Sequence, residues 1–186
     1  MTATTADVDG RRQRAARSRD AVLDAILDLL GEGNMRPGAD EIAERAGVSP
    51  RTVFRHFADF EELFAAAADR QGERIAHLFT GPPPASVDEL VEHRAALYEA
   101  IAPVRRAGLR HAPFHAALRT RLDGVHRALR RQLATAFGAR GDALDALDAA
   151  TSWAAWDTLR SEQQLSAARA RRVMALVVTS ILEKET

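Results

Sequence analysis

The chain has 186 residues, of which 46% are hydrophobic and 28% charged, as in an ordinary globular protein long enough to bury a core. It contains no cysteine and has no apolar run of the roughly 18 residues that a membrane helix needs. These features exclude disulfides, thiolate zinc sites and a membrane partner, and the absence of a signal-peptide core makes a cytoplasmic location the expectation.

The N-terminal segment is basic, although the chain as a whole is neutral, with 26 basic and 26 acidic residues. All the basic residues are arginine except Lys184. Residues 1–19 contain five arginines and two acidic residues, whereas residues 20–62 contain four arginines and ten acidic residues. Because residues 1–17 also lack apolar periodicity, they are predicted to form a disordered basic arm.

The rest of the chain predicts an all-α fold of about nine helices, because alanine, leucine and arginine are abundant while β-branched and aromatic residues are sparse. A first helix is expected over residues 18–30, with an apolar stripe that includes Leu23 and Ile26. A short helix at 39–46, a turn at Gly47 and a second short helix opening with Ser49-Pro50 follow.

Capping residues and helix breakers divide the remainder. Asp59 with Glu62 predicts a helix to about Phe79, and Ser86 with Glu89 predicts one to about residue 102. Glycines and prolines then separate a short helix from helices near 114–137, 142–160 and 166–183. The expected organisation is an arm (1–17), an N-terminal three-helix domain (18–62) and a helical C-terminal domain (63–186).

Residues 40–57 indicate a helix-turn-helix. Ala43 is small where two helices would cross, and Gly47 can adopt the left-handed conformation that the turn demands. The polar residues of the second short helix then fall on its exposed side. A helix of this size fits the major groove of DNA.

This run resembles the N-terminal domain of TetR-family transcriptional repressors. The family pattern is filled by Gly33, Ile42-Ala43, Ala46–Ser49, Thr52–Phe54 and His56-Phe57, within a resemblance that covers about residues 18–64. Residues 156–160, followed by Leu165-Ser166 at the start of the last helix, are similar to the family's final two helices. The resemblance implies a homodimeric repressor, not an enzyme and without a cofactor, that binds a palindromic double-stranded DNA operator. A small-molecule effector, unknown from the sequence, would bind in the C-terminal domain and release the repressor.

The resemblance also implies roles for single residues: Pro50 and Arg51 would approach bases, and their polar neighbours would hold phosphates. Three positions depart from the family, because Phe54 replaces the common tyrosine, Phe60 replaces a lysine and Pro37-Gly38 replaces a threonine pair. We hypothesise that other arginines replace the lost contacts. The expected DNA-binding residues are Ser49, Pro50, Arg51, Thr52, Phe54, Arg55, His56, Arg17 and Arg36.

The C-terminal domain offers candidates for an effector pocket, as aromatic side chains and two histidines. They are Phe79, Tyr98, His111, Phe114, His115, Trp153 and Trp156. His111 and His115 have the spacing of metal ligands on a helix, but Pro113 separates them and no carboxylate is near in sequence, so no metal site is expected. For each aromatic residue, ordinary core packing is the alternative.

The last helix is apolar over more of its circumference than one packing face requires, which predicts burial against both its own domain and a partner chain. The residues expected at the dimer interface are Leu144, Leu147, Val173, Leu176, Val177, Ser180 and Ile181.

Two other functions remain open at this stage. One is an all-α small-molecule-binding or catalytic protein without a DNA role, although no nucleophile lies beside a base and no glycine-rich phosphate loop occurs. The other is a non-specific architectural DNA protein. Activation in place of repression would depend on where the operator lies. Because the helix-turn-helix is surrounded by acidic residues, we expect it to contact few DNA phosphates and to bind non-specific DNA with modest affinity.

Overall fold

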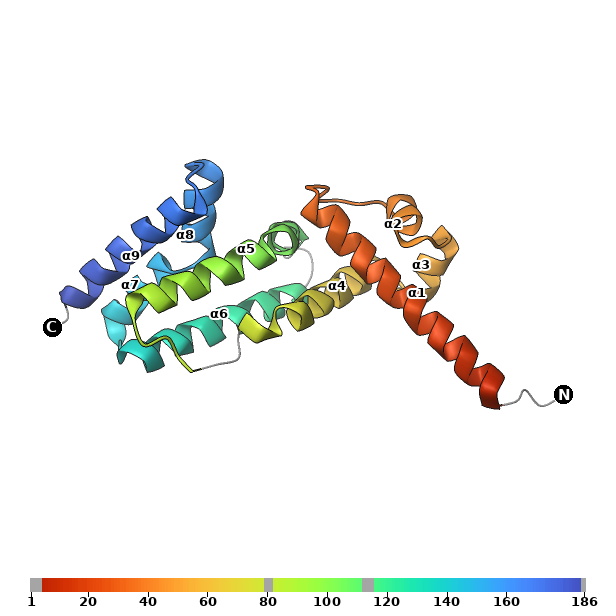
Figure 1. Cartoon of the computed structure of the whole chain (residues 1–186), viewed down its shortest axis with the longest axis horizontal. Helices are drawn as coiled ribbons and strands as arrows, with labels where there is room; N and C mark the ends of the chain where they lie inside the picture. Colours follow the sequence, from red (N-terminus) through yellow and green to blue (C-terminus); the bar gives the residue numbers. More distant parts are fainter. Residues whose placement is uncertain (1–4, 79–81, 112–115, 185–186) are drawn as a thin grey trace. The chain divides into compact units, whose positions relative to one another are not determined.

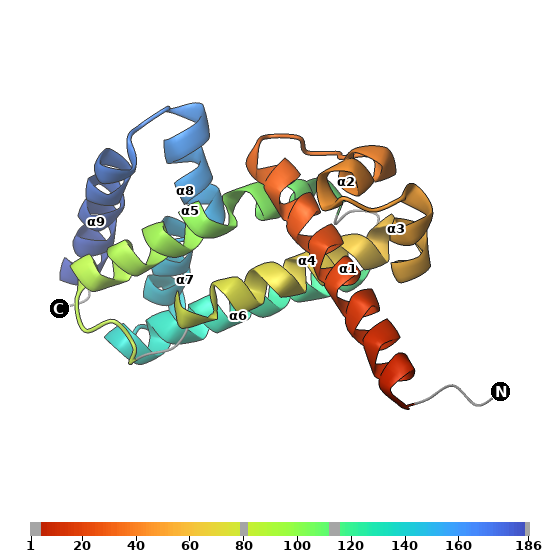
Figure 2. The same cartoon turned by 45° about the vertical axis from the view of Figure 1, so that its right-hand side comes forward.

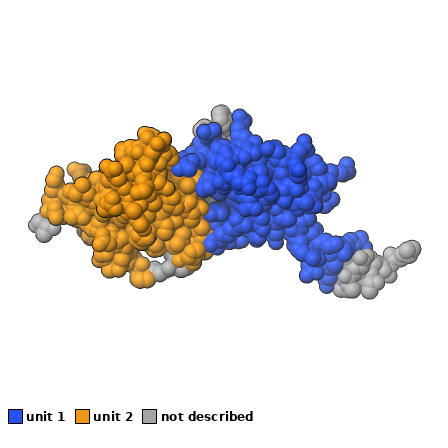
Figure 3. Space-filling view, turned by 45° about the horizontal axis from the view of Figure 1, so that its top comes forward, with its two compact units in different colours: residues 1–74, 103–118 blue, residues 75–102, 119–186 orange. Residues whose placement is uncertain are grey.

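The computed structural model describes residues 5–78, 82–111 and 116–184, which form two compact units (Figures 1 and 3). Unit 1 comprises residues 1–74 and 103–118, and unit 2 comprises residues 75–102 and 119–186. All the regular structure in these described ranges is helical, which confirms the all-α prediction. None of the described helices is long and apolar enough to cross a membrane.

Unit 1 is built on α1 (Thr5–Gly31), which contacts three further helices. These are α2 (Ala39–Ala46), α3 (Pro50–His56) and α4 (Phe60–Arg74), and Figure 2 shows α1 crossing α4. The predicted stripe of α1 is buried, with Ile26 completely inaccessible to solvent. It packs in one core with Ile42, Val53 and Phe57, so the helix-turn-helix is held against α1 by apolar burial.

The turn between α2 and α3 has the predicted local geometry. Gly47 has a φ of 66° and a ψ of 32°, and the amide of Val48 donates to the carbonyl of Ala43 at 2.9 Å. The hydroxyl of Ser49 accepts a hydrogen bond from the amide of Thr52 at 3.2 Å, and Pro50 opens the helix. The left-handed residue and the N-cap therefore define where α2 ends and α3 begins.

The N-terminal segment differs from the sequence expectation. Residues 5–17, predicted as a disordered arm, belong to α1, and the side chains of residues 11–17 are exposed. Alanine and arginine have high helix propensity, so a helix already stabilised by its buried half continues outward without an apolar face of its own. The arginines of this segment are thus carried on a helix.

Polar contacts add to the packing of unit 1. Oγ of Ser18 on α1 lies 2.7 Å from Nε2 of His56 on α3, in a hydrogen bond. The guanidinium of Arg19 lies 5.1 Å from the ring centroid of Phe57, in cation–π geometry. On α4, Arg70 donates two hydrogen bonds of 3.0 Å to the carboxylate of Asp24.

Unit 2 contains the N-terminal part of α5 (Val87–His111) and most of α6 (Ala116–Phe137). The remaining elements are the 3-10 turn η1 (Ala76–Leu78), α7 (Gly141–Ala150), α8 (Trp153–Asp157), the π-helical turn η3 (Thr158–Glu162) and α9 (Ala167–Glu183). Their core includes Leu90, Tyr98, Leu147, Trp156 and Met174.

Three helix boundaries predicted for the C-terminal part were wrong. The helix expected to run to about Phe79 ends at Arg74 and is followed by the turn η1. Instead of ending near residue 102, α5 continues through Pro103 to His111, where Val104 and Ala107 pack in the core of unit 1. The free energy gained by burying these side chains offsets the loss of the backbone hydrogen bond that proline cannot donate.

The helix expected over 142–160 is interrupted at Thr151 and Ser152. Thr151 donates its hydroxyl to the carbonyl of Leu147 at 2.8 Å, and Ser152 caps the new helix α8. The predicted 18–62 domain is also smaller than unit 1, which includes all of α4 and residues 103–118.

Gly47→Ala is expected to lower the free energy of unfolding by about 1 kcal/mol, because alanine pays a steric cost in the left-handed conformation. The added Cβ would meet no atom within 4 Å, so the effect isolates the backbone. Gly31→Ala, also without a neighbour within 4 Å but with no positive φ, is the control. Urea denaturation followed by circular dichroism measures both, and equal stabilities would contradict the prediction.

The pKa of His56 is lowered from its ordinary 6.5, first by burial and then by the charges of Arg55 and Arg19. The unfolded chain therefore binds this proton more readily, and stability is lost as the pH falls below about 6.5. We expect His56→Gln to show a shallower fall in melting temperature between about pH 7.5 and 5.5 than the unmodified chain. Ser18→Ala, which keeps the titrating ring, should retain the fall; identical slopes for all three proteins would refute this assignment.

Candidate nucleic-acid interface

One side of α3 presents an exposed row of side chains: Ser49, Pro50, Arg51, Phe54 and Arg55. Phe54 is 62% exposed, although phenylalanine side chains in folded proteins are usually buried. The apolar positions Val53 and Phe57 point into the core instead. Because of the helix period, the exposed residues predicted to contact DNA and the core residues lie on different sides of α3.

Two groups of arginines in unit 1 differ in whether an acidic partner engages them. Arg45 makes two hydrogen bonds of 2.8 Å with Glu32, and both Arg70 and Arg74 bond to Asp24. The hydrogen bonds from Arg70 lower the pKa of Asp24 below its ordinary value, in spite of partial burial. In these ion pairs the acidic and basic side chains neutralise each other's charge.

Arg36, Arg51 and Arg55 form the second group. Within the part of the chain that the structure describes, their guanidinium groups make no ion pair and no hydrogen bond. Arg17 is exposed and bonds only to the carbonyl of Gln13 in its own helix, at 3.4 Å. A free guanidinium offers a planar set of donors to phosphate or guanine, so these arginines are the side chains of this face that can form such contacts.

Two residues that were predicted to bind phosphate already have hydrogen-bond partners inside the protein. Thr52 lies with its hydroxyl 3.0 Å from that of Ser49, and His56 is bonded to Ser18. Both are half-buried. Sequence reasoning missed Ser18 and Arg19, whose contacts with α3 arise from tertiary packing and leave no pattern along the chain.

The aromatic candidates for the effector pocket form part of the core of unit 2. The ring of Tyr98 lies 5.7 Å from that of Trp153 and 6.5 Å from that of Trp156, centroid to centroid. Tyr98 donates its hydroxyl to the carbonyl of Thr151 at 2.7 Å, and Trp156 donates its indole N–H to Glu99 at 3.0 Å. Their polar ends are thus satisfied by the protein.

The other pocket candidates fall outside what the structure describes: Phe79, Phe114 and His115 entirely, and His111 for its side chain. No group of three or more acidic or histidine side chains among the described residues is arranged to hold a metal ion.

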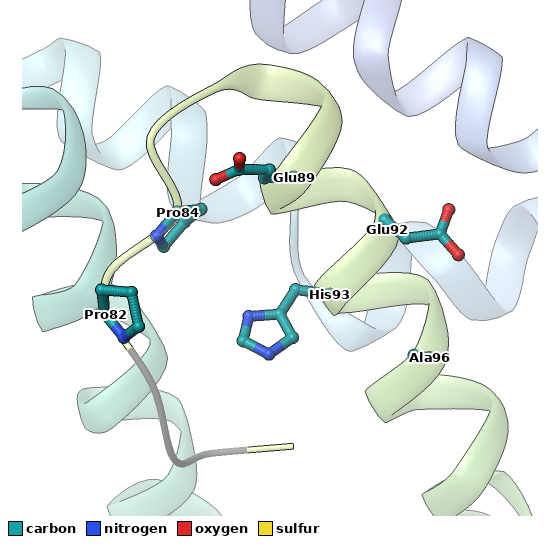
Figure 4. Close-up of a pocket in the computed structure, with 6 residues that line it drawn as sticks. All are labelled: Pro82, Pro84, Glu89, Glu92, His93 and Ala96. Atoms are coloured by element: carbon teal, nitrogen blue, oxygen red, sulfur yellow. The ribbon is translucent and has the colours of Figure 1, made fainter. Parts of the chain in front are cut away.

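Two pockets lie on the surface of unit 2. Figure 4 shows the first, of about 310 Å³, between the proline segment at 82–84 and α5, with His93 facing it. Glu89 at its edge caps α5 by accepting from the amide of Ala85 at 2.8 Å. The second, of about 330 Å³, lies between α5 and α9, where Arg171 donates to Glu92 at 2.7 Å. Tyr98, Trp153 and Trp156, the predicted pocket residues whose side chains the structure describes, line neither one.

On α9, one face is buried and an adjacent apolar strip is not. Ala170, Met174 and Val178 pack in unit 2, whereas Leu176 is 68% and Val177 43% exposed. Of the other predicted interface residues, Ser180 is exposed and Val173, Ile181 and Leu144 are half-buried. Leu147 is completely buried in unit 2, which leaves it no surface to offer a partner.

Comparisons with known proteins agree with this architecture. Residues 22–67 match the model for bacterial regulatory proteins of the tetR family. The chain is 33% identical to the HTH-type transcriptional repressor Rv3405c of Mycobacterium tuberculosis over 143 residues, which cover 70% of this chain and 74% of that protein. The chain is also 42% identical to the HTH-type transcriptional regulator TcmR of Streptomyces glaucescens over 64 residues, which cover 33% of this chain and 28% of TcmR.

Solved structures share the fold. A transcriptional regulator from Rhodococcus sp. Rha1 superimposes with a TM-score of 0.69 at 20% identity, covering 91% of this chain and 96% of that one. A tetR-family transcriptional regulator from Streptomyces coelicolor gives a TM-score of 0.65 at 19% identity, covering 88% and 80%. With the extended match to Rv3405c, these findings place the chain in the tetR family of bacterial regulatory proteins, as a helix-turn-helix transcriptional regulator.

Proposed function

We propose that the protein is a cytoplasmic, non-enzymatic repressor that binds a palindromic operator as a homodimer and is released by a small-molecule effector bound in unit 2. The observation that carries the proposal is the distribution of guanidinium groups. Arg51 and Arg55 lie on the exposed side of α3 and have no ion pair with a described residue, while Arg45 and Arg70 are neutralised elsewhere in the unit. No cofactor is required.

The contacts on DNA would divide by position along α3. Arg51, next to the N-terminus of the helix, would reach base edges in the major groove and pair with guanine. Arg55 and Arg36 would hold phosphates, and Arg17 would add a further phosphate contact from α1. Because Arg45, Arg70 and Arg74 are engaged by acidic side chains, they are not available to phosphate, which favours a small number of phosphate contacts and modest non-specific affinity.

Release would follow from differential binding. An effector shifts the equilibrium between two conformations only by the difference in its affinity for them. In unit 1, Arg70 and Arg74 of α4 are bonded to Asp24 of α1, so a displacement of α4 would move α1 and the helix-turn-helix with it. In a dimer, that movement would change the spacing of the two recognition helices.

Dimerisation would use the exposed strip of α9. Leu176 and Val177 are large apolar side chains left uncovered next to a fully buried face of the same helix. Two-fold association through such helices buries the strip of each chain against the other. A two-fold dimer also matches a palindromic operator.

Arg51→Ala is expected to weaken binding to a palindrome from the protein's own promoter region by about 5- to 150-fold, since a bidentate arginine–guanine pair is worth about 1–3 kcal/mol. Binding to a scrambled duplex should change much less. Fluorescence anisotropy at fixed salt measures both, with Arg169→Ala on α9 as the control for loss of an exposed arginine. An equal loss on both duplexes would show that Arg51 contacts only the backbone.

Leu176→Glu is expected to convert the dimer into monomers in sedimentation experiments at micromolar concentration, because it places a charge in an apolar interface. Operator affinity should fall together with the mass, while the helical circular dichroism is retained. Ala168→Glu, at another exposed position of α9, is the matched control. A Leu176→Glu protein that remains dimeric would rule out this interface.

A further inference from the structure

Arg94 is a charged residue in the interior of unit 2. It lies on α5, and its side chain is only 2% exposed. Along the helix it occupies the apolar stripe formed by Leu90, Leu97 and Tyr98, which are all buried. An arginine at a core position is uncommon unless a counter-ion accompanies it.

The residues that the structure describes do not supply that counter-ion at contact distance. Nη1 of Arg94 donates to Oε1 of Gln132 at 2.9 Å, and Nη2 donates to the carbonyl of Leu129 at 3.0 Å. Both acceptors are neutral, and Nε is buried without an acceptor from any described residue. Among the described residues, no carboxylate lies within 4 Å of this guanidinium.

The carboxylate with the largest electrostatic influence on Arg94 is already engaged. Asp148 lies 3.2 Å from the guanidinium of Arg130 and 3.3 Å from His126. Burial lowers the pKa of Arg94, but a guanidinium remains charged in proteins, so the cation persists in the core. A helix-to-helix tie between α5 and α6 would not need this charge, because an apolar side chain of similar length packs there without the desolvation cost.

We propose that Arg94 is the anion-recognition residue of the effector site, and that the effector is a small organic carboxylate with an apolar body. Nε and a neighbouring Nη are the donor pair that a carboxylate accepts in bidentate geometry. The apolar core of unit 2 around α5 and α6 suits the rest of such a ligand. This inference rests on the proposed function, since it names the chemical class of the effector.

Arg94 lines neither of the two surface pockets described above, and the proposal takes the carboxylate to bind a conformation in which α5 and α6 separate around it. A ligand that stabilises this open form, and not the closed one, supplies the differential affinity that release from DNA requires. The unsatisfied Nε of the closed form is the group that gains a partner on opening.

The test uses thermal denaturation of the full chain without DNA. Butyrate, hexanoate, octanoate and benzoate are each compared with the corresponding neutral amide at equal ionic strength. At least one carboxylate should raise the melting temperature by about 2–4 °C at saturating concentration, and its amide should not. Arg94→Met should abolish the rise, while Arg131→Met, on the exposed side of α6, should retain it.

Without ligand, Arg94→Met should melt at the same or a higher temperature, because an uncompensated buried charge has been removed. If Arg94→Met does not fold, Arg94→Lys replaces it: it keeps the charge but not the planar fork, and should weaken carboxylate binding at least about 10-fold. The proposal is overturned if no carboxylate stabilises the protein, or if the rise in melting temperature persists after Arg94 is replaced. Operator binding is measured separately, so a failure here leaves the DNA-binding proposal standing.

Discussion

Helices as short as α2 and α3 are not stable alone in water, and the helix that faces DNA therefore depends on a surface supplied by another element. That surface is the apolar stripe of α1, where Ile26 and Leu30 are completely buried against the helix-turn-helix. α4 completes the same core through Leu63 and Phe64. The orientation of the recognition side chains is thus set by burial on the opposite side of their helix, and the polar contacts of Ser18 and Arg19 refine it.

Features governed by neighbouring residues were predictable from the sequence. The left-handed turn at Gly47 and the cap at Ser49 follow from steric and hydrogen-bonding rules that act within four residues. Features decided by distant contacts were not. The passage of α5 through Pro103 depends on the burial of Val104 and Ala107 in another part of the chain. The helical state of residues 5–17 reflects propensity where periodicity gave no signal.

The candidate site divides in the same way. The motif identifies which residues face DNA, but not which arginines are free, because Arg45 and Arg70 find their acidic partners 13 and 46 residues away. Arg94 did leave a signal, as a charge inside the apolar stripe of its helix. An arginine in such a position can also extend its head to solvent along its aliphatic stem. Its 2% exposure in the folded protein decides between these two outcomes.

The free cations of the contact face have a chemical consequence. All are guanidinium groups, which stay protonated across the physiological pH range, so acidification changes the charge of this face only through its histidine. Lysine acylation, a common way of neutralising cations that bind nucleic acids, has a single side-chain target in this sequence, Lys184 after the end of α9. An amine-reactive fluorophore directed to that side chain would therefore leave every arginine of the recognition helix unmodified.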